Sequence, residues 1–400
     1  MQLSIITIDY NDAEGLRKTL ASVAAQTYPH IQHIIVDGGS TGGSVEIIRE
    51  YADNQAKGER LEVKGMGNEV KGERLEVKGE ENGGADTPAS TLYTLHSTPT
   101  EISTTIYTNL HNSTPPKHNV LWVSEPDKGI YNAMNKGIEI ALGKRIVNDD
   151  QTSSLIASSP DRLIASDYIQ ILNSGDILAA PDVTERMMAM LKAQQAKGER
   201  LEAKGMANSK ADTPAFTPYT LHSTPTDASR LENCPAIFYG NMIKENPDGH
   251  RVKDTCGGGD YTPESFLYFY RGTLNHDCAY IRRDLFEKYG LYNEQMKICS
   301  DWEWYVRAIV LGGEKTVYTN IDVTVFDMTG ISESDGKNKD IILKERREYL
   351  ESILPRTILH DYDRYSLPIV QYQRLKKYHL WGIVHFVERV LFKLERVFRR

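Results

Sequence analysis

Acidic and small polar side chains follow four short apolar runs of the sequence, each near the point where its run ends. The first run ends in Asp9-Tyr10-Asn11, and the second ends in Asp37, which a glycine-rich turn follows. The third is followed by Asp127-Lys128 and the fourth by Asn173-Ser174-Gly175-Asp176. Any one of these aspartates could cap a helix or form a turn. Their recurrence at matching positions indicates one shared site instead.

The residue types in these clusters favour a hard cation and a phosphate-bearing ligand. Carboxylates without nearby His or Cys are the ligands that Mg²⁺ or Mn²⁺ prefers, and such an ion commonly bridges a protein carboxylate and a diphosphate. The turn at Gly38–Gly43 allows a ligand to approach the backbone closely. It matches neither the dinucleotide-binding glycine motif nor the Walker loop, so neither a dinucleotide nor ATP hydrolysis is indicated.

The elements that position these residues alternate between strands and amphipathic helices. This alternation predicts an α/β fold with a mostly parallel sheet and helices on both faces, which binds ligands beyond the carboxyl ends of its strands. Strands are expected at Leu3–Ile8, Ile31–Asp37, Val120–Glu125, Tyr168–Leu172 and Ile237–Met242, and helices at Ala13–Ala25, Ser44–Asp53, Ile130–Leu142 and Pro181–Ala193.

Repeated polar segments interrupt this pattern. Lys57–Gly65 recurs unchanged as Lys71–Gly79 and nearly unchanged as Lys197–Gly205, and Ala85–Thr100 closely matches Ala211–Thr226. Their composition buries too little apolar surface to offset the entropy cost of ordering. We therefore expect low-complexity, mostly disordered inserts at about residues 55–118 and 195–232, with a third interruption at 144–166. Each joins a helix to the next strand, which places it at the sheet edge opposite the ligand site.

Five segments resemble the family 2 glycosyltransferases with the GT-A fold. They are Ser4–Gln26, His33–Ser44, Trp122–Gly137, Tyr168–Asp176 and Lys297–Trp304. Their order and spacing agree with the family once the inserts are removed. The resemblance implies a GT-A catalytic domain over residues 1–332, interrupted by the inserts, and a carboxyl-terminal helical tail over residues 333–400.

The same resemblance implies how a nucleotide-sugar donor is bound. Asp37 matches the residue that contacts the base, and Asp127 and Lys128 match the segment beside the ribose and diphosphate. Asp176 stands at the final position of the family's D-x-D motif, so it is the expected ligand of Mg²⁺ or Mn²⁺, although the first aspartate of the motif is missing. Gly42 is a second departure, since relatives often carry Asp there. The full set of expected donor contacts is Thr7, Tyr10, Asn11, Asp37, Ser40, Asp127, Lys128, Asn173, Ser174, Gly175 and Asp176.

Asp301 matches the family's catalytic base, which takes the proton of the acceptor hydroxyl as that oxygen attacks the anomeric carbon with inversion. Glu303 remains an alternative base. The Ser300–Trp304 segment is equally typical of a helix start, and both readings are compatible. His276, Trp302 and Glu303 are candidates for the acceptor side, although a lone histidine is as often structural.

The amino-acid composition limits which partners the protein is expected to bind and where in the cell it is expected to lie. The net charge of −8 argues against nucleic-acid binding. Four irregularly spaced cysteines suggest free thiols in a reducing compartment. Neither a signal peptide nor an apolar run of about 18 residues is apparent, so we expect a cytoplasmic protein. An apolar stripe at Leu380–Phe398 with basic ends suits peripheral contact with the inner face of the cytoplasmic membrane; docking onto the catalytic domain or a second subunit is the alternative.

The expected function is inverting transfer of a sugar, most simply from a UDP-sugar, to a glycan or lipid-linked acceptor. The resemblance points to bacterial surface polysaccharide or lipid-linked oligosaccharide synthesis. A processive synthase is disfavoured because membrane spans and its Q-x-x-R-W motif are missing. The alternatives are a sugar-nucleotide nucleotidyltransferase, whose basic glycine-rich loop is not found, and a non-catalytic nucleotide-sugar-binding protein, which would not need Asp301.

Overall fold

One mixed sheet runs through the computed structural model, which describes residues 1–57, 116–145, 164, 166–208, 234–246, 248–256, 263, 265–328 and 338–398. Residues 197–208 and 396–398 are described by their backbone alone. The strands are β1 (Leu3–Asp9), β2 (Ile31–Asp37), β3 (Asn119–Ser124), β4 (Tyr168–Ile171), β5 (Ile177–Leu178), β6 (Ile237–Glu245), β7 (Arg251–Asp254), β8 (Ala279–Arg282) and β9 (Thr316–Asp327). Their order is β3-β2-β1-β4-β8-β6-β9-β5, and β7 pairs with β6.

The amino-terminal half of the sheet is parallel. Strand β1 pairs in parallel with β2 and β4, and β2 pairs in parallel with β3. The register places Asp9 opposite Asp37, and Asp37 opposite Ser124. The carboxyl ends of three adjacent strands therefore meet at one edge, as the sequence predicts.

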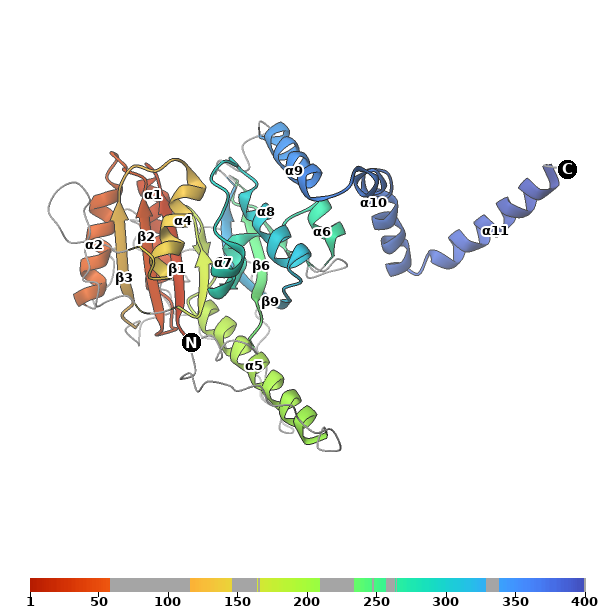
Figure 1. Cartoon of the computed structure of the whole chain (residues 1–400). Helices are drawn as coiled ribbons and strands as arrows, with labels where there is room; N and C mark the ends of the chain where they lie inside the picture. Colours follow the sequence, from red (N-terminus) through yellow and green to blue (C-terminus); the bar gives the residue numbers. More distant parts are fainter. Residues whose placement is uncertain are drawn as a thin grey trace, which may run out of the picture.

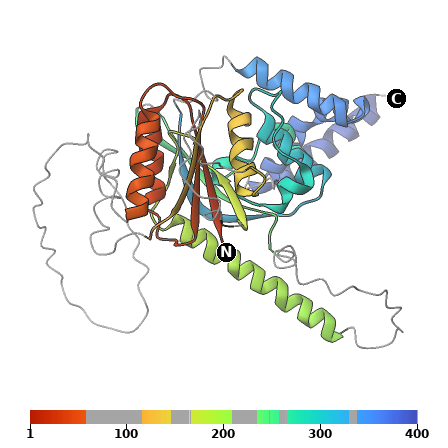
Figure 2. The same cartoon turned by 60° about the vertical axis from the view of Figure 1, so that its left-hand side comes forward.

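Helices cover both faces of this half, as Figures 1 and 2 show. Helices α1 (Ala13–Ala24) and α2 (Ser44–Lys57) pack on one face, in a cluster with Ile35 and Trp122. Helix α4 (Ile130–Ala141) contacts β1 and β2 from the other face, where Met134 joins the main core cluster. Alternate residues of a strand point to opposite faces, so an apolar run is buried on both sides.

The carboxyl-terminal half of the sheet is mixed. Strand β8 is antiparallel to both β4 and β6, whereas β9 is parallel to β6 and antiparallel to β5. Short helices connect these strands: α6 (Phe266–Arg271), η3 (His276–Cys278), α7 (Asp284–Tyr289), α8 (Ser300–Tyr305) and the π-helical η4 (Val306–Leu311). The predicted α/β class with helices on both faces is confirmed, and parallel pairing is concentrated in β1–β4.

Helix α5 corrects one predicted boundary. We expected it to end at Ala193, but it spans Val183–Asn208 and enters the segment assigned to the second insert. Ala, Lys, Glu, Arg and Leu favour helix, and their propensities sustain the helix despite two glycines. It extends away from the sheet in Figure 2. The remaining insert residues, 58–115, 146–163 and 209–233, lie outside the described part of the chain.

The carboxyl-terminal tail is helical, as predicted, and its first part packs against the sheet domain. Helices α9 (Lys339–Ile353), α10 (Arg356–Lys377) and α11 (Trp381–Phe398) follow in order. Leu350 and Leu359 are buried in the main core cluster, and Arg347 joins α9 to Asp363 on α10. Helix α11 lies beyond this packing (Figure 1). Within the described residues, no helix is long and apolar enough to cross a membrane.

Candidate active site

The carboxylate of Asp37 organises the turn that follows β2. Its Oδ2 accepts hydrogen bonds from the backbone N–H groups of Gly39 and Ser40, at 3.1 and 3.0 Å, and from Ser124 Oγ at 2.6 Å. Its Oδ1 is buried without a hydrogen-bond partner in the described structure. A buried acceptor normally has a partner, and because Asp37 is 0% exposed, only a group that inserts into this turn could donate to the unpaired oxygen.

A second loop, after β1, is tied to this turn. Asn11 has a left-handed backbone (φ 56°), its N–H donates to Ser40 Oγ at 2.7 Å, and its Oδ1 accepts from the Thr41 N–H at 2.9 Å. Tyr10 is 68% exposed. A bulky exposed aromatic beside a rigid polar turn provides a surface on which a flat ring can stack.

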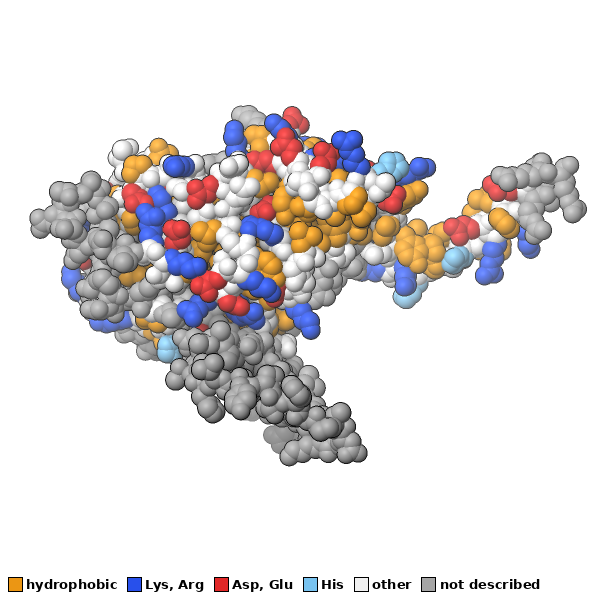
Figure 3. All heavy atoms as spheres, in the orientation of Figure 1, with side chains coloured by type: hydrophobic (Ala, Val, Ile, Leu, Met, Phe, Trp, Pro, Cys, Tyr) orange, Lys and Arg blue, Asp and Glu red, His pale blue; other side chains and the backbone are white. Residues whose placement is uncertain are grey.

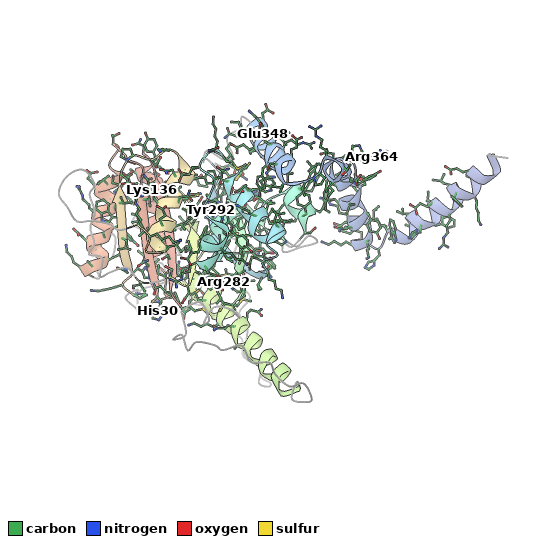
Figure 4. The ribbon with its side chains drawn as sticks, viewed as in Figure 1. His30, Lys136, Arg282, Tyr292, Glu348 and Arg364 are labelled. Carbon is green, nitrogen blue, oxygen red and sulfur yellow. The ribbon has the colours of Figure 1, made fainter. Side chains whose placement is uncertain are left out.

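Asp127 completes this group from the loop after β3. A Cβ built on Gly38 would lie 2.4 Å from Asp127 Oδ2 and 3.1 Å from a ring carbon of Tyr10, so both side chains close over the turn. Lys136 of α4, labelled in Figure 4, holds the preceding segment through the carbonyl of Pro126 at 2.9 Å. The structure thus brings together Tyr10, Asn11, Asp37, Ser40 and Asp127, with Lys128 exposed beside them.

Thr7 does not join this group. It is buried within β1, and its Oγ1 shares a 2.9 Å hydrogen bond with His33 Nε2. Burial lowers the pKa of His33 to about 3, so this histidine is neutral inside the sheet. The side chain of Thr7 therefore lies inside the sheet and apart from this group, and the expected donor contact of Thr7 stays a prediction.

The turn after β4 places Asp176 at the same edge. Gly175 adopts φ 96°, and Thr19 Oγ1 accepts from its N–H at 3.0 Å and donates to the Asp176 carbonyl at 2.7 Å. Asp176 is 3% exposed, and its Oδ1 accepts from the Asp327 N–H at 3.0 Å. Burial, followed by the charge of Asp277, raises the pKa of Asp176 well above its usual value. Its neighbours in the turn face other loops, since Ser174 Oγ lies 3.4 Å from Asp12 Oδ2.

The carboxylates near this turn have the donor chemistry of a Mg²⁺ or Mn²⁺ site. Asp277, whose side chain hydrogen-bonds that of Asp176, is also buried, and burial raises its pKa. The raised pKa values favour a proton on this pair of carboxyl groups, and a bound cation in its place would offset the repulsion between the two carboxylates. The described residues contain no group of three His, Cys, Asp or Glu side chains that could hold a metal by themselves. Mg²⁺ commonly takes one or two carboxylates and completes its shell with phosphate and water, so Asp176 fits such a shared site.

Asp301 lies near the start of α8 and is bound from two sides. Its Oδ2 lies 3.3 Å from His276 Nδ1, and its Oδ1 lies 3.1 Å from the Tyr131 hydroxyl, whose single proton is shared with the Ile298 carbonyl. Its side chain is 15% exposed. Burial alone would raise the pKa of Asp301, but the hydrogen bond and charge of His276 outweigh it and lower the pKa below its usual value. Asp301 is therefore an anion at neutral pH.

His276 links this carboxylate to the β4 turn. Its Nε2 lies 3.2 Å from the acceptor Asp277 Oδ1 and 3.1 Å from Asn173 Nδ2, a donor that contacts the charged ring without a hydrogen bond. Burial lowers its pKa, but Asp277 and Asp301 more than compensate and raise the pKa to about 9. The ring is thus an imidazolium between two carboxylates, and it forms a bridge where an acceptor-side contact was expected.

The other two residues expected on the acceptor side are engaged elsewhere. Trp302 is 1% exposed, and its indole N–H donates to the Phe269 carbonyl at 2.8 Å. Glu303 is 5% exposed and pairs with Arg307 at 2.9 Å. The Asp301 side chain is 15% exposed against 7% for Glu303, so Asp301 is the more accessible carboxylate and the geometry favours it over Glu303 as the base.

Comparison with protein families gives a match to the glycosyl transferase family 2 model over residues 4–71. This range contains β1, β2 and the loops that follow them at Tyr10–Asn11 and Gly38–Gly43, here called the donor loops. The resemblance to family 2 glycosyltransferases is confirmed. An uncharacterized glycosyltransferase of Mycobacterium tuberculosis is 54% identical over 39 residues, 10% of this chain and 15% of the relative. Glycosyltransferase AglE of Haloferax volcanii is 40% identical over 52 residues, 12% of this chain and 17% of the relative. Each match thus spans less than a fifth of the relative's own length.

Some solved structures are similar to this chain at low sequence identity. S. aureus TarS 1-349 in complex with UDP-GlcNAc is 12% identical, with a TM-score of 0.46 over 94% of this chain and 73% of that chain. The mannosyltransferase PcManGT of Pyrobaculum calidifontis, in complex with GDP-Man and Mn²⁺, is 13% identical, with a TM-score of 0.39 over 81% and 56%.

Sequence reasoning missed two side chains that the structure adds to the site. Tyr131 lies within the Trp122–Gly137 segment, and its hydroxyl reaches Asp301 from a helix far away in the sequence. Asp277 follows His276 directly and pairs with both His276 and Asp176. The Asn275-His276-Asp277 triplet was a usable signal, because two titratable residues beside an amide rarely serve packing alone.

Proposed function

We propose that this protein is an inverting glycosyltransferase that moves a sugar from a nucleotide-diphosphate sugar to an acceptor hydroxyl. The observation that carries the proposal is a continuous set of contacts from the donor loops to an anionic base. Ser174 contacts Asp12 beside the first donor loop, Asn173 contacts His276, and His276 contacts Asp301. Such contacts hold a donor and a general base in one fixed geometry, which catalysis of group transfer requires.

Each donor loop has a distinct task in this proposal. Asp37 accepts an N–H of the base through its unpaired Oδ1, and Tyr10 stacks on the ring. Asp127 and the exposed Lys128 lie beside the ribose and the diphosphate. A uracil base offers one N–H for such an acceptor, so a UDP-sugar is the donor that we expect. Asp176 would hold Mg²⁺ or Mn²⁺ together with the diphosphate, and the bound cation would supply charge neutralisation of that leaving group.

Asp301 performs the proton transfer. Its carboxylate takes the proton of the acceptor hydroxyl while that oxygen forms a bond to the anomeric carbon. The bond between the anomeric carbon and the diphosphate oxygen breaks on the opposite face, and the electron pair leaves with the nucleoside diphosphate. His276 and Tyr131 keep the carboxylate anionic and oriented before the reaction.

The acceptor is a glycan or a lipid-linked sugar in this proposal, and α11 contacts an anionic membrane, which places the enzyme at the inner face of the cytoplasmic membrane. One side of α11 exposes large apolar residues, among them Ile383 at 62%, Val387 at 48% and Leu391 at 55%. Arg389 and Lys393 lie on its other side and are exposed. Figure 3 shows the apolar side chains along α10 and α11. An amphipathic helix with a basic polar face suits an anionic lipid surface.

Calorimetry with nucleotide sugars, with and without Mn²⁺, tests the proposal first, and release of nucleoside diphosphate tests it second. We expect a UDP-sugar to bind more tightly with the cation and to be slowly hydrolysed in the absence of an acceptor. Binding without any turnover would favour a non-catalytic nucleotide-sugar-binding protein. Formation of a nucleotide sugar from a sugar phosphate and a nucleoside triphosphate would favour a nucleotidyltransferase.

A further inference from the structure

A carboxylate of the tail binds the loop that leads to the catalytic base. Glu345 of α9 accepts hydrogen bonds from three consecutive backbone N–H groups. Lys297 N lies 2.6 Å from Oε1, and Ile298 N and Cys299 N lie 3.1 and 3.0 Å from Oε2. Asp301 follows two residues later. Hydrogen bonds to an ionised acceptor are roughly twice as strong as neutral ones, so this contact fixes the loop firmly.

The same loop is held from the opposite side by α4. The hydroxyl of Tyr131 donates to the carbonyl of Ile298 and also lies 3.1 Å from Asp301 Oδ1. Ile298 is therefore bound through its N–H by Glu345 and through its carbonyl by Tyr131. A shift of this peptide would change the distance between Tyr131 and Asp301 directly.

Other contacts of α9 lie against the helix that carries the base. The guanidinium of Arg346 lies 5.0 Å from the ring centre of Trp302, and the ring of Tyr349 lies 5.8 Å from it. Trp302 is the residue after Asp301. The tail thus contacts both the segment before the base and the residue after it.

We propose that Glu345 is a positioning residue for Asp301, and that α9 belongs to the catalytic unit rather than to a separate tail. The proposal rests on the proposed function, because it assigns Glu345 a role only through the base. Glu345 touches neither donor loop in the described structure, so it acts on the proton-transfer step and leaves nucleotide binding unchanged.

The variant Glu345→Gln tests this role. Glutamine keeps one carbonyl oxygen but turns an NH₂ group toward a backbone N–H, so at least one of the three hydrogen bonds is lost. We expect kcat to fall between about 10-fold and about 100-fold, the range for a small misplacement of a catalytic group. The KM for the donor and the Kd for UDP should stay within about twofold of wild type.

Glu348→Gln is the matched control. Glu348 lies on the outer side of the same helix, labelled in Figure 4, where its side chain is 66% exposed and pairs with Lys344 at 3.8 Å. Its substitution should leave kcat unchanged. A kcat of Glu345→Gln within twofold of this control would overturn the proposal, and so would a parallel loss of UDP affinity, which would show a general structural role.

A double variant separates positioning from stability. Because Asp301→Asn has no base left to position, adding Glu345→Gln should not lower its residual activity further. This residual activity is measured over hours with radiolabelled donor. An additive loss would contradict the proposal. Full activity in Asp301→Asn itself would sink the assignment of the base. An inactive Asp301→Asn with a fully active Glu345→Gln would sink only the role of Glu345.

Discussion

The substitution Asp301→Asn removes the proton acceptor while keeping the size of the side chain. Asparagine retains an oxygen that can accept from Tyr131, but its NH₂ group cannot receive the hydrogen bond of His276. The imidazolium loses one of its two carboxylate partners, which leaves Asp277. The site should stay folded because the remaining contacts of α8, including those of Trp302 and Glu303, are untouched.

The expected loss follows from the protonation state that the structure gives the base. A positioned general base contributes about 10²- to 10⁴-fold to a rate, and each tenfold corresponds to about 1.4 kcal/mol. Because His276 holds the pKa of Asp301 below its usual value, the base is ionised at neutral pH and the substitution removes its full effect. We therefore expect kcat to fall by about 10² or more with the Kd for UDP nearly unchanged.

The ionisation of Asp301 and His276 should also determine how the stability and activity of the wild-type enzyme depend on pH. The lowered pKa of Asp301 gives stability that is present above its unfolded value of 3.8 and is lost as the pH falls through the folded pKa. The raised pKa of His276 gives stability that is full below 6.5 and is lost as the pH rises through about 9. Activity should therefore decline near pH 9, as the imidazolium loses its charge.

Steady-state kinetics with a coupled assay for UDP measure this prediction, with Glu303→Gln as the comparison. Glu303 pairs with Arg307, so its substitution should lower the melting temperature but leave kcat per folded molecule within a few-fold of wild type. Undiminished activity in Asp301→Asn, together with a large loss in Glu303→Gln, would refute the reasoning and make Glu303 the base.

Three further predictions follow from the metal carboxylate, the inserts and the tail. Asp176→Asn should abolish the Mn²⁺-dependent part of UDP binding in calorimetry. Without metal it should raise stability increasingly as the pH rises above 3.8, because the raised pKa of the native carboxyl costs stability there; a melting temperature that falls at neutral pH would contradict this. Replacing residues 58–115 and 209–233 with short Gly/Ser linkers should preserve activity, and a folded variant that hydrolyses donor but no longer transfers to acceptor would show that they bind the acceptor. Ile383→Asp with Leu391→Asp should reduce sedimentation with phosphatidylglycerol vesicles at least tenfold relative to Glu388→Gln, whereas a dimer that these changes dissolve would show that the face binds a second copy.

The sequence predicts the parallel half of the fold well because its strands are short apolar runs that end in polar turns. Asp37 and Asp127 could be placed together from strand order alone, since parallel strands end at one edge of a sheet. The extension of α5 to Asn208 was missed because repeats with two glycines resemble linkers, although their other residues favour helix.

Positions inside the site were harder to predict, for a different reason. Thr7 and Trp302 belong to the segments that resemble the family, but the alternation of a strand and the turn of a helix direct their side chains into the core. Tyr131 and Glu345 reach the base from α4 and α9, and pairings between such distant segments leave no periodic trace in a single sequence. Motifs therefore supplied Asp301 as the candidate base, which stays a prediction, whereas the contacts around it required the structure.

The anomer released first during hydrolysis of a UDP-α-sugar tests the central claim most directly. Proton NMR recorded within minutes of mixing wild-type protein, donor and Mn²⁺ distinguishes the two anomers before they interconvert. We expect the β-anomer to be released first, because water takes the place of the acceptor hydroxyl on the face opposite the diphosphate, and Asp301→Asn to release almost none. Initial release of the α-anomer, or equal release by the variant, would contradict this claim.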